Sequence, residues 1–161
     1  MPKVLITGMS GTGKSTALRI LGERGHRVVE TDSEEWSQTV TLPDGSSDWV
    51  WRVNAIAELL ANHTEGSLFV AGCKSNQSKF YPRPENEPNF DHVALFSAPA
   101  DVMLARIASR TDNPYGKTPV ERALILHHLA AVEPLLRNHA TIEIDASRPI
   151  DEVVRQLESL T

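Results

Sequence analysis

The chain has 161 residues, of which 40% are hydrophobic and 23% charged, a composition typical of one folded domain rather than of a disordered chain. Its 16 basic and 21 acidic residues give a net charge of −5, which disfavours broad binding to nucleic acid. No apolar run approaches the roughly 20 residues that a membrane span needs. The single cysteine, Cys73, excludes an internal disulfide. We therefore expect a single domain over residues 1–161 in a cytoplasmic protein without a membrane or nucleic-acid partner.

Five short apolar runs alternate along the chain with segments of helical periodicity. The runs predict β-strands at residues 3–7, 27–31, 67–71, 92–96 and 141–145. Apolar residues at helical spacing and capping signals predict helices over residues 16–24, after Asp48, around residues 98–108, from the capping box at Thr118, and from Pro149 onward. Residues 33–47 and 72–90 are expected to be irregular. Strands separated by helices predict a parallel sheet with helices on both faces, and such sheets bind ligands beyond the carboxyl ends of their strands.

A phosphate-binding loop follows the first predicted strand and precedes the first predicted helix. The pattern G-x-x-x-x-G-K-[ST] is matched in full by Gly8-Met9-Ser10-Gly11-Thr12-Gly13-Lys14-Ser15. Its glycines let backbone N–H groups turn toward phosphate oxygens, and the helix N-terminus adds a positive dipole end. Lys14 would reach the β- and γ-phosphates, and the Ser15 hydroxyl would bind Mg²⁺. The sequence therefore predicts a nucleoside triphosphate site at residues 8–16, ending at Thr16.

The absence of certain signature motifs excludes two classes of P-loop protein. A GTPase would carry N-K-x-D and D-x-x-G, and a transporter ATPase an L-S-G-G-Q-like signature, and this sequence contains none of them. The early loop, the length and the strand–helix alternation resemble the small P-loop kinases, such as nucleoside monophosphate, shikimate and gluconate kinases. They are also similar to bacterial AAA family ATPase or nucleotide-kinase-like proteins. The resemblance implies an α/β, three-layer P-loop NTPase fold. It would have a five-stranded parallel sheet in the order 2-3-1-4-5, a short lid, and ATP·Mg²⁺ as donor with ADP as product.

A candidate lid lies at about residues 110–118. Arg106 and Arg110 are four residues apart near the end of a predicted helix, so they share one face. A Pro/Gly loop with Lys117 follows, and then a new helix. In the small P-loop kinases, arginines at this place clamp ATP and stabilise the transferring group, and the resemblance implies this catalytic role for both arginines and a lesser one for Lys117. The alternative is a solvated basic helix end that the helix dipole favours.

Asp32 closes the second predicted strand. Shikimate-type kinases carry an aspartate at this strand end, so the resemblance implies that Asp32 activates an acceptor hydroxyl or binds Mg²⁺ beside Ser15. The third predicted strand runs into Gly72-Cys73-Lys74-Ser75 without a Walker-B-like aspartate, which makes Asp32 the candidate second carboxylate. A surface aspartate that begins a turn is the alternative.

The acceptor side is expected in residues 33–60 and 72–90. All three tryptophans (36, 49 and 51) lie in the first segment, where they would stack on a base or sugar or else pack in the core. The candidate acceptor-binding residues are Asp32, Trp36, Arg52, Asn76, Gln77 and Arg83, with Lys74 and Lys79 as further cations for an anionic acceptor. In the family the turn after the fifth strand lies along adenine, which implies this role for Ser147, Arg148 and Pro149. The neighbouring His127 and His128 lack partners at metal-ligand spacing, so no zinc site is expected.

These residues predict an ATP-dependent phosphotransferase that moves the γ-phosphoryl group of ATP·Mg²⁺ to a small-molecule acceptor, a nucleotide or a hydroxyl compound. A phosphate acceptor needs no base, whereas a hydroxyl acceptor makes Asp32 necessary. The alternative is an ATP-binding or slow ATPase regulatory module without an acceptor, which the missing Walker-B-like aspartate leaves open. Both a monomer and a homodimer are compatible with the sequence.

Overall fold

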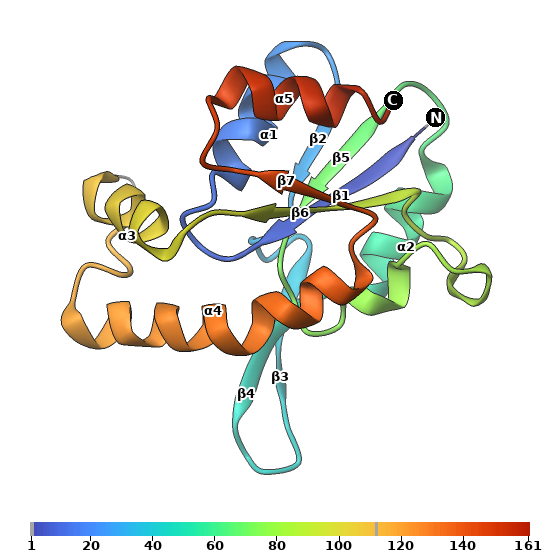
Figure 1. Cartoon of the computed structure of the whole chain (residues 1–161). Coiled ribbons are helices and arrows are strands. Elements are labelled where there is room, and N and C mark those ends of the chain that lie inside the picture. Colours follow the sequence, from blue (N-terminus) through green and yellow to red (C-terminus); the bar gives the residue numbers. More distant parts are fainter. Residues whose placement is uncertain (1, 112) are drawn as a thin grey trace.

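The computed structural model describes residues 2–111 and 113–161, and a five-stranded parallel sheet forms its centre (Figure 1). The sheet has the order β2-β5-β1-β6-β7. Its strands are β1 (Lys3–Gly8), β2 (Arg27–Glu30), β5 (Leu68–Ala71), β6 (His92–Ser97) and β7 (Ile142–Asp145). Counted among themselves along the chain, these strands follow the predicted order 2-3-1-4-5, so the predicted P-loop NTPase fold is confirmed.

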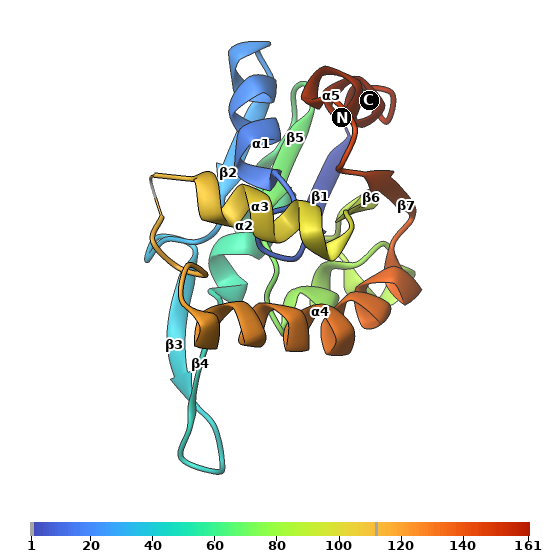
Figure 2. The same ribbon diagram turned by 60° about the vertical axis from the view of Figure 1, so that its left-hand side comes forward.

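Helices cover both faces of the sheet (Figures 1 and 2). On one face lie α1 (Lys14–Glu23) and α5 (Ile150–Glu158), and on the other lie α2 (Val53–Asn62) and α4 (Pro119–His139). Helix α3 (Ala100–Ser109) packs against α4. None of the described helices is long and apolar enough to cross a membrane.

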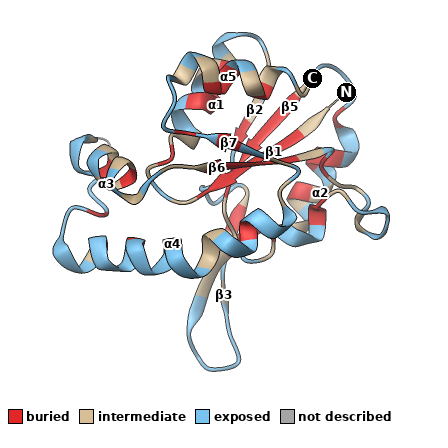
Figure 3. Ribbon diagram, in the orientation of Figure 1, coloured by how far each residue is buried: buried red, intermediate tan, exposed pale blue. Residues whose placement is uncertain are grey.

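The central strands β5, β1 and β6 are largely buried on both faces, as their continuous apolar runs predict, whereas the edge strands β2 and β7 each have exposed residues (Figure 3). Side chains of β1 alternate between the two layers: Val4 and Ile6 pack in the cluster that contains α1 and α5, whereas Leu5 packs in the cluster that contains α2. The capping box that predicts α4 is confirmed, because Thr118 Oγ1 accepts a hydrogen bond from the backbone N–H of Glu121 at 3.2 Å. Packing on both faces fixes the carboxyl ends of β1, β2 and β5 side by side.

An antiparallel hairpin projects from the sheet in Figures 1 and 2, formed by β3 (Ser37–Thr41) and β4 (Ser47–Trp51). The prediction that residues 33–47 are irregular is therefore wrong. Asp48 does not cap a helix either, because it pairs opposite Val40 inside the hairpin, and α2 begins five residues later. Residues 72–90 contain two short 3₁₀ helices, η1 (Gln77–Phe80) and η2 (Pro84–Asn86), within otherwise irregular chain.

Candidate functional site

The phosphate-binding loop runs from the end of β1 into α1. Gly11 and Gly13 have φ angles of +82° and +88°, which side chains rarely adopt. A Cβ atom on Gly11 would lie 2.8 Å from the carbonyl oxygen of Met103, so glycine is also required for close packing against α3. The Thr12 hydroxyl donates to the carbonyl of Met9 at 2.8 Å. The loop is thus braced at a helix N-terminus, an arrangement that fits phosphate oxygens.

Lys14 lies across the mouth of this loop. Its Nζ donates hydrogen bonds to the carbonyl oxygens of Gly8 at 2.5 Å and Met9 at 3.0 Å. Burial lowers the pKa of Lys14, while the nearby Cys73 and Glu30 act in the opposite direction. A phosphate group beside the ammonium would offset its desolvation through charge attraction. The side chain therefore suits an anionic ligand.

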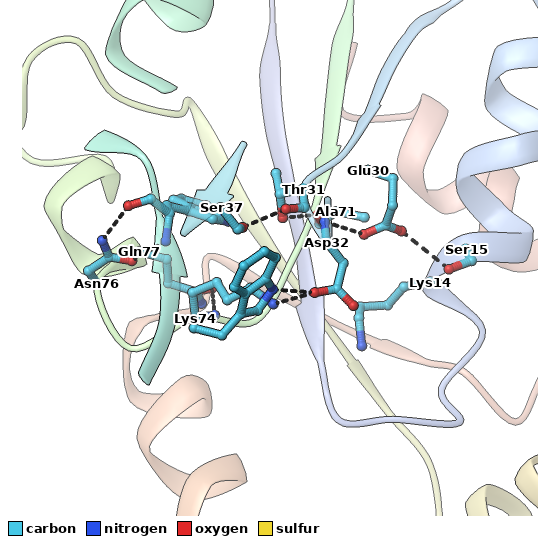
Figure 4. A network of polar contacts seen from close by, with 12 residues as sticks. Lys14, Ser15, Glu30, Thr31, Asp32, Ser37, Ala71, Lys74, Asn76 and Gln77 are labelled. Atoms are coloured by element: carbon cyan, nitrogen blue, oxygen red, sulfur yellow. Dashed lines mark hydrogen bonds and ion pairs between the residues drawn. The ribbon is translucent and has the colours of Figure 1, made fainter. Parts of the chain in front are cut away.

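Two acidic side chains stand at the end of β2, and the first of them, Glu30, was not among the predicted site residues (Figure 4). Ser15 Oγ donates to Glu30 Oε2 at 3.3 Å, and Glu30 Oε1 accepts from the backbone N–H of Asp32 at 3.3 Å. The sequence carried a signal for Glu30, because it lies two residues before Asp32. Together Ser15 and Glu30 present the oxygen donors that Mg²⁺ prefers, so this corner of the loop fits the ion.

The Asp32 carboxylate is held by two donors from other segments. Trp49 Nε1, on the hairpin, donates to Asp32 Oδ1 at 2.7 Å, and Lys74 Nζ, after β5, donates to the same oxygen at 3.0 Å. Burial by itself raises the pKa of the Asp32 carboxyl, but the bonds from Lys74 and Trp49 outweigh it and hold the pKa below its usual value. Asp32 is therefore ionised at neutral pH and can accept a proton.

These groups line one cavity of about 840 Å³. Its volume lies in the range of roughly 300–1,000 Å³ that is usual for ligand sites. The lining comes from the phosphate loop, the ends of β2 and β5, the end of α3 and the connection to α4, the turn after β7 and the first residues of α5: residues 8–16, Glu30, Asp32, Gly72, Cys73, Lys74, Arg106, Ser109, Arg110, Asn113, Ala146, Arg148, Ile150 and Val153. Every residue predicted for phosphate binding, and Asp32, thus reaches the same space.

Both predicted lid arginines line the cavity, but they differ in their contacts. Arg106 Nη1 lies 3.5 Å from the carbonyl oxygen of Thr12 in the phosphate loop. Arg110 donates to the carbonyls of Asn113 at 3.1 Å and Tyr115 at 2.6 Å, which shapes the connection to α4. The predicted lid includes Asp112, which lies outside the described residues. Lys117 donates to the Arg110 carbonyl and is not part of the cavity lining.

The turn after β7 and the start of α5 line a further part of the cavity. Ala146, Ile150 and Val153 give it apolar surface, which suits the face of a base. Of the predicted turn residues, Arg148 lines the cavity and forms an ion pair with Glu152 at 3.0 Å. The neighbouring residues 147 and 149 are absent from the described lining.

Most predicted acceptor residues make contacts within the fold instead of lining the cavity. Gln77 is only 1% exposed, and its amide bonds Thr7, Tyr81 and the backbone N–H of Lys74. Asn76 bonds both backbone groups of Trp51. These two amides therefore brace the chain around β5.

The other acceptor candidates also have partners away from the cavity. Arg52 donates to the carbonyl of Glu34 at 2.8 Å, and Arg83 bonds His139 at 2.8 Å. Trp36 is half-buried and packs against the core cluster on the α2 face of the sheet. Among the six predicted acceptor residues, Asp32 alone belongs to the described cavity lining.

Comparisons with known proteins agree with this geometry. The model of the AAA domain family matches residues 4–127. A nucleotide-binding protein from Deinococcus radiodurans is 29% identical over 119 residues, which are 73% of this chain and 38% of that protein, so this chain spans well under half of its length.

Solved structures of small kinases share the fold. Shikimate kinase from Acinetobacter baumannii, solved in complex with shikimate, is 16% identical with a TM-score of 0.64, over 99% of this chain and 92% of that one. Shikimate kinase from Bacteroides thetaiotaomicron is 17% identical with a TM-score of 0.64, over 99% and 97%. A gluconokinase from Sinorhizobium meliloti is 18% identical with a TM-score of 0.61, over 99% and 90%. At these identities the likeness shows the fold alone.

Proposed function

The chain belongs to the AAA domain family, and we propose that it is an ATP-dependent phosphotransferase that transfers the γ-phosphoryl group of ATP to a hydroxyl of a small molecule. One observation carries the proposal: the phosphate loop and the Asp32 carboxylate line the same cavity. The likeness to solved small kinases supports it. With this activity we propose a cytoplasmic location, where ATP is available.

The phosphate end of the cavity would stabilise the transferring group. Negative charge spreads over three oxygens in the transition state, so cations and N–H donors must converge on them. The loop N–H groups, Lys14 and Arg106 converge at this place. Arg110, at the start of the lid, would join them when the lid closes. Ser15 and Glu30, with Asp32 beside them, would hold Mg²⁺, which when bound neutralises phosphate charge.

At the other end, Asp32 would act on the acceptor. Its Oδ1 atom is engaged by Trp49 and Lys74, and among the described residues nothing bonds Oδ2. In our proposal the acceptor oxygen forms the new bond to phosphorus, its proton passes to Asp32 Oδ2, and the bond to the bridging oxygen of ADP breaks. Because the transition state is loose, a carboxylate with a lowered pKa is a sufficient base.

A regulatory ATP-binding or slow ATPase module is the second candidate. One observation favours it: the polar residues expected to bind an acceptor form hydrogen bonds with other residues of the chain instead, as Gln77, Asn76 and Arg52 do. This module would need the phosphate loop and would not need Asp32.

Acceptor-dependent ADP release distinguishes the two candidates. We would screen the protein with ATP, Mg²⁺ and panels of nucleosides, nucleotides, sugars and sugar acids. The proposal predicts release above background with at least one acceptor, its loss in Asp32→Asn, and retained ATP binding in that variant. Lys14→Ala is the control that removes turnover through the phosphate end instead. An identical slow release under all conditions would favour the module.

A further inference from the structure

We propose that the acceptor is an uncharged hydroxyl compound, such as a nucleoside or a polyol, and not a nucleotide, a sugar phosphate or a carboxylic acid. The inference rests on the proposed function and adds the class of substrate. It follows from how the charges at the acceptor end of the cavity are paired.

The cations that line the cavity are unevenly distributed. Lys14 belongs to the phosphate loop, Arg106 to α3, Arg110 to the start of the lid and Arg148 to the turn after β7. Among the described lining residues that follow β2 and β5, the acceptor end contains a single cation, Lys74. An anionic acceptor would therefore have to bind Lys74 or else draw a cation away from the donor phosphates.

Lys74 is already engaged. Its ammonium forms an ion pair with Asp32 at 3.0 Å, and its side chain is 12% exposed (Figure 4). The backbone N–H of Lys74 donates to Gln77 Oε1 at 2.9 Å, and Gln77 is itself buried and bonded to Thr7 and Tyr81. These contacts hold Lys74 against Asp32. The ammonium charge of Lys74 therefore neutralises the Asp32 carboxylate and is not available to an anionic ligand.

The surroundings add negative charge. Two carboxylates, Glu30 and Asp32, line the cavity at the end of β2. Asp48 accepts a hydrogen bond from Ser75 Oγ at 2.7 Å, next to Lys74. A phosphate or carboxylate on the acceptor would meet the carboxylates of Glu30 and Asp32, and among the described lining residues after β2 and β5 the single cation, Lys74, is already paired.

The same network suits a neutral hydroxyl. Trp49 and Lys74 both bond Oδ1 of Asp32, which leaves Oδ2 as the oxygen that can accept a proton. The half-buried Trp49 indole fixes the orientation of the carboxylate through this bond, so Oδ2 keeps its place in the cavity lined by Asp32. An uncharged polyhydroxy compound can donate a hydrogen bond to Oδ2 without burying an unpaired charge.

Matched acceptor pairs test the inference. Each pair keeps the same free hydroxyls and differs in one anionic group: gluconamide and gluconate, glucuronamide and glucuronate, methyl glucoside and glucose 1-phosphate, and 3′-O-methyladenosine and adenosine 3′-monophosphate. We expect ADP release with an uncharged member at least about 10-fold faster than with its anionic partner. Faster release with the anionic member of the active pair would overturn the inference and leave the proposed function standing. Equal background release throughout would refute the proposed function and the inference with it.

A binding experiment tests the charge pairing without turnover. With a non-hydrolysable ATP analogue and Mg²⁺ on the phosphate loop, ribose 5-phosphate serves as the anionic probe in calorimetry. Asp32→Asn removes the partner of Lys74, so we expect a gain in probe affinity of at least about 10-fold over the parent protein. The control Asp32→Asn/Lys74→Met should lose this gain. Equal probe affinity in the parent and Asp32→Asn, or an undiminished gain in the double variant, would overturn the inference.

Discussion

The hydrogen bonds of the buried Gln77 amide are expected to position Lys74, and a single substitution at Gln77 tests this role. The amide donates to Thr7 Oγ1 at 3.1 Å and to the Tyr81 hydroxyl at 3.0 Å, and accepts from the backbone N–H of Lys74 at 2.9 Å. Gln77→Met keeps the length and most of the volume of the side chain but removes all three hydrogen bonds. We expect this variant to be less stable and to lose the fixed position of Lys74.

The size of the effect follows from the three bonds. Each contributes about 1 kcal/mol to stability, and the buried methyl group of Met returns a part of the sum, so we expect a loss of about 2–3 kcal/mol. For a chain of this length that loss lowers the melting temperature by about 4–12 °C. If Gln77 instead bound the acceptor, as its place after β5 suggests, its replacement would lower the affinity for the acceptor and change the free energy of unfolding little.

Urea and thermal unfolding, followed by circular dichroism, measure the loss. Ser78→Ala is the matched control in the next residue, because the exposed Ser78 hydroxyl makes no hydrogen bond with the described residues. It should change stability by less than about 0.5 kcal/mol. A Gln77→Met variant as stable as the control would refute the assignment of Gln77 as a structural brace.

Two further predictions concern the loop and the pH dependence of stability. Gly11→Ala should be destabilised by about 1–3 kcal/mol more than Gly45→Ala in urea unfolding, because both glycines have positive φ but only at Gly11 would the new Cβ meet a backbone carbonyl of α3 at 2.8 Å. Equal losses would show that the close packing of the loop is unimportant. The hydrogen bond from His26, with that from Arg24, holds the pKa of the Glu158 carboxyl below its ordinary value of 4.5. A lowered folded pKa contributes stability above pH 4.5 that is lost as the pH falls through the folded value. The stability difference between the parent and Glu158→Gln, about 0.2–1 kcal/mol at pH 7 for such an exposed pair, should therefore shrink toward pH 3, and a difference independent of pH would contradict this.

Local patterns predicted the sheet and the phosphate loop well. Continuous apolar runs marked the five parallel strands, and the loop motif lay between the first run and a helical segment, so its partners were close in sequence. Local patterns do not predict the hairpin, because β3 is short and mostly polar, and the apolar run Trp49-Val50-Trp51 of β4 follows Asp48, a common helix cap, and leads directly into α2. The turn at Pro43-Asp44-Gly45 was an available signal, since this combination is typical of tight turns.

The acceptor side could not be predicted because its contacts are long-range. Lys74 lies 42 residues from Asp32 and Trp49 lies 17 residues from it, and nothing local indicates that they share one carboxylate oxygen. Gln77 and Asn76 occupy a loop, where polar residues commonly bind ligands, but the fold turns both amides toward backbone and buried hydroxyl groups. The two donors to Asp32 thus depend on how the hairpin and β5 meet in space.

The fate of the γ-phosphoryl group tests the central claim most directly. ATP, Mg²⁺ and the best acceptor of the screen would be incubated with the protein in water enriched in ¹⁸O, and the products analysed by mass spectrometry. Transfer to the acceptor hydroxyl predicts a phosphorylated acceptor whose phosphate contains no ¹⁸O, in an amount equal to the ADP formed. Inorganic phosphate that carries one ¹⁸O atom, with the acceptor unchanged, would contradict the claim and identify the protein as an ATPase.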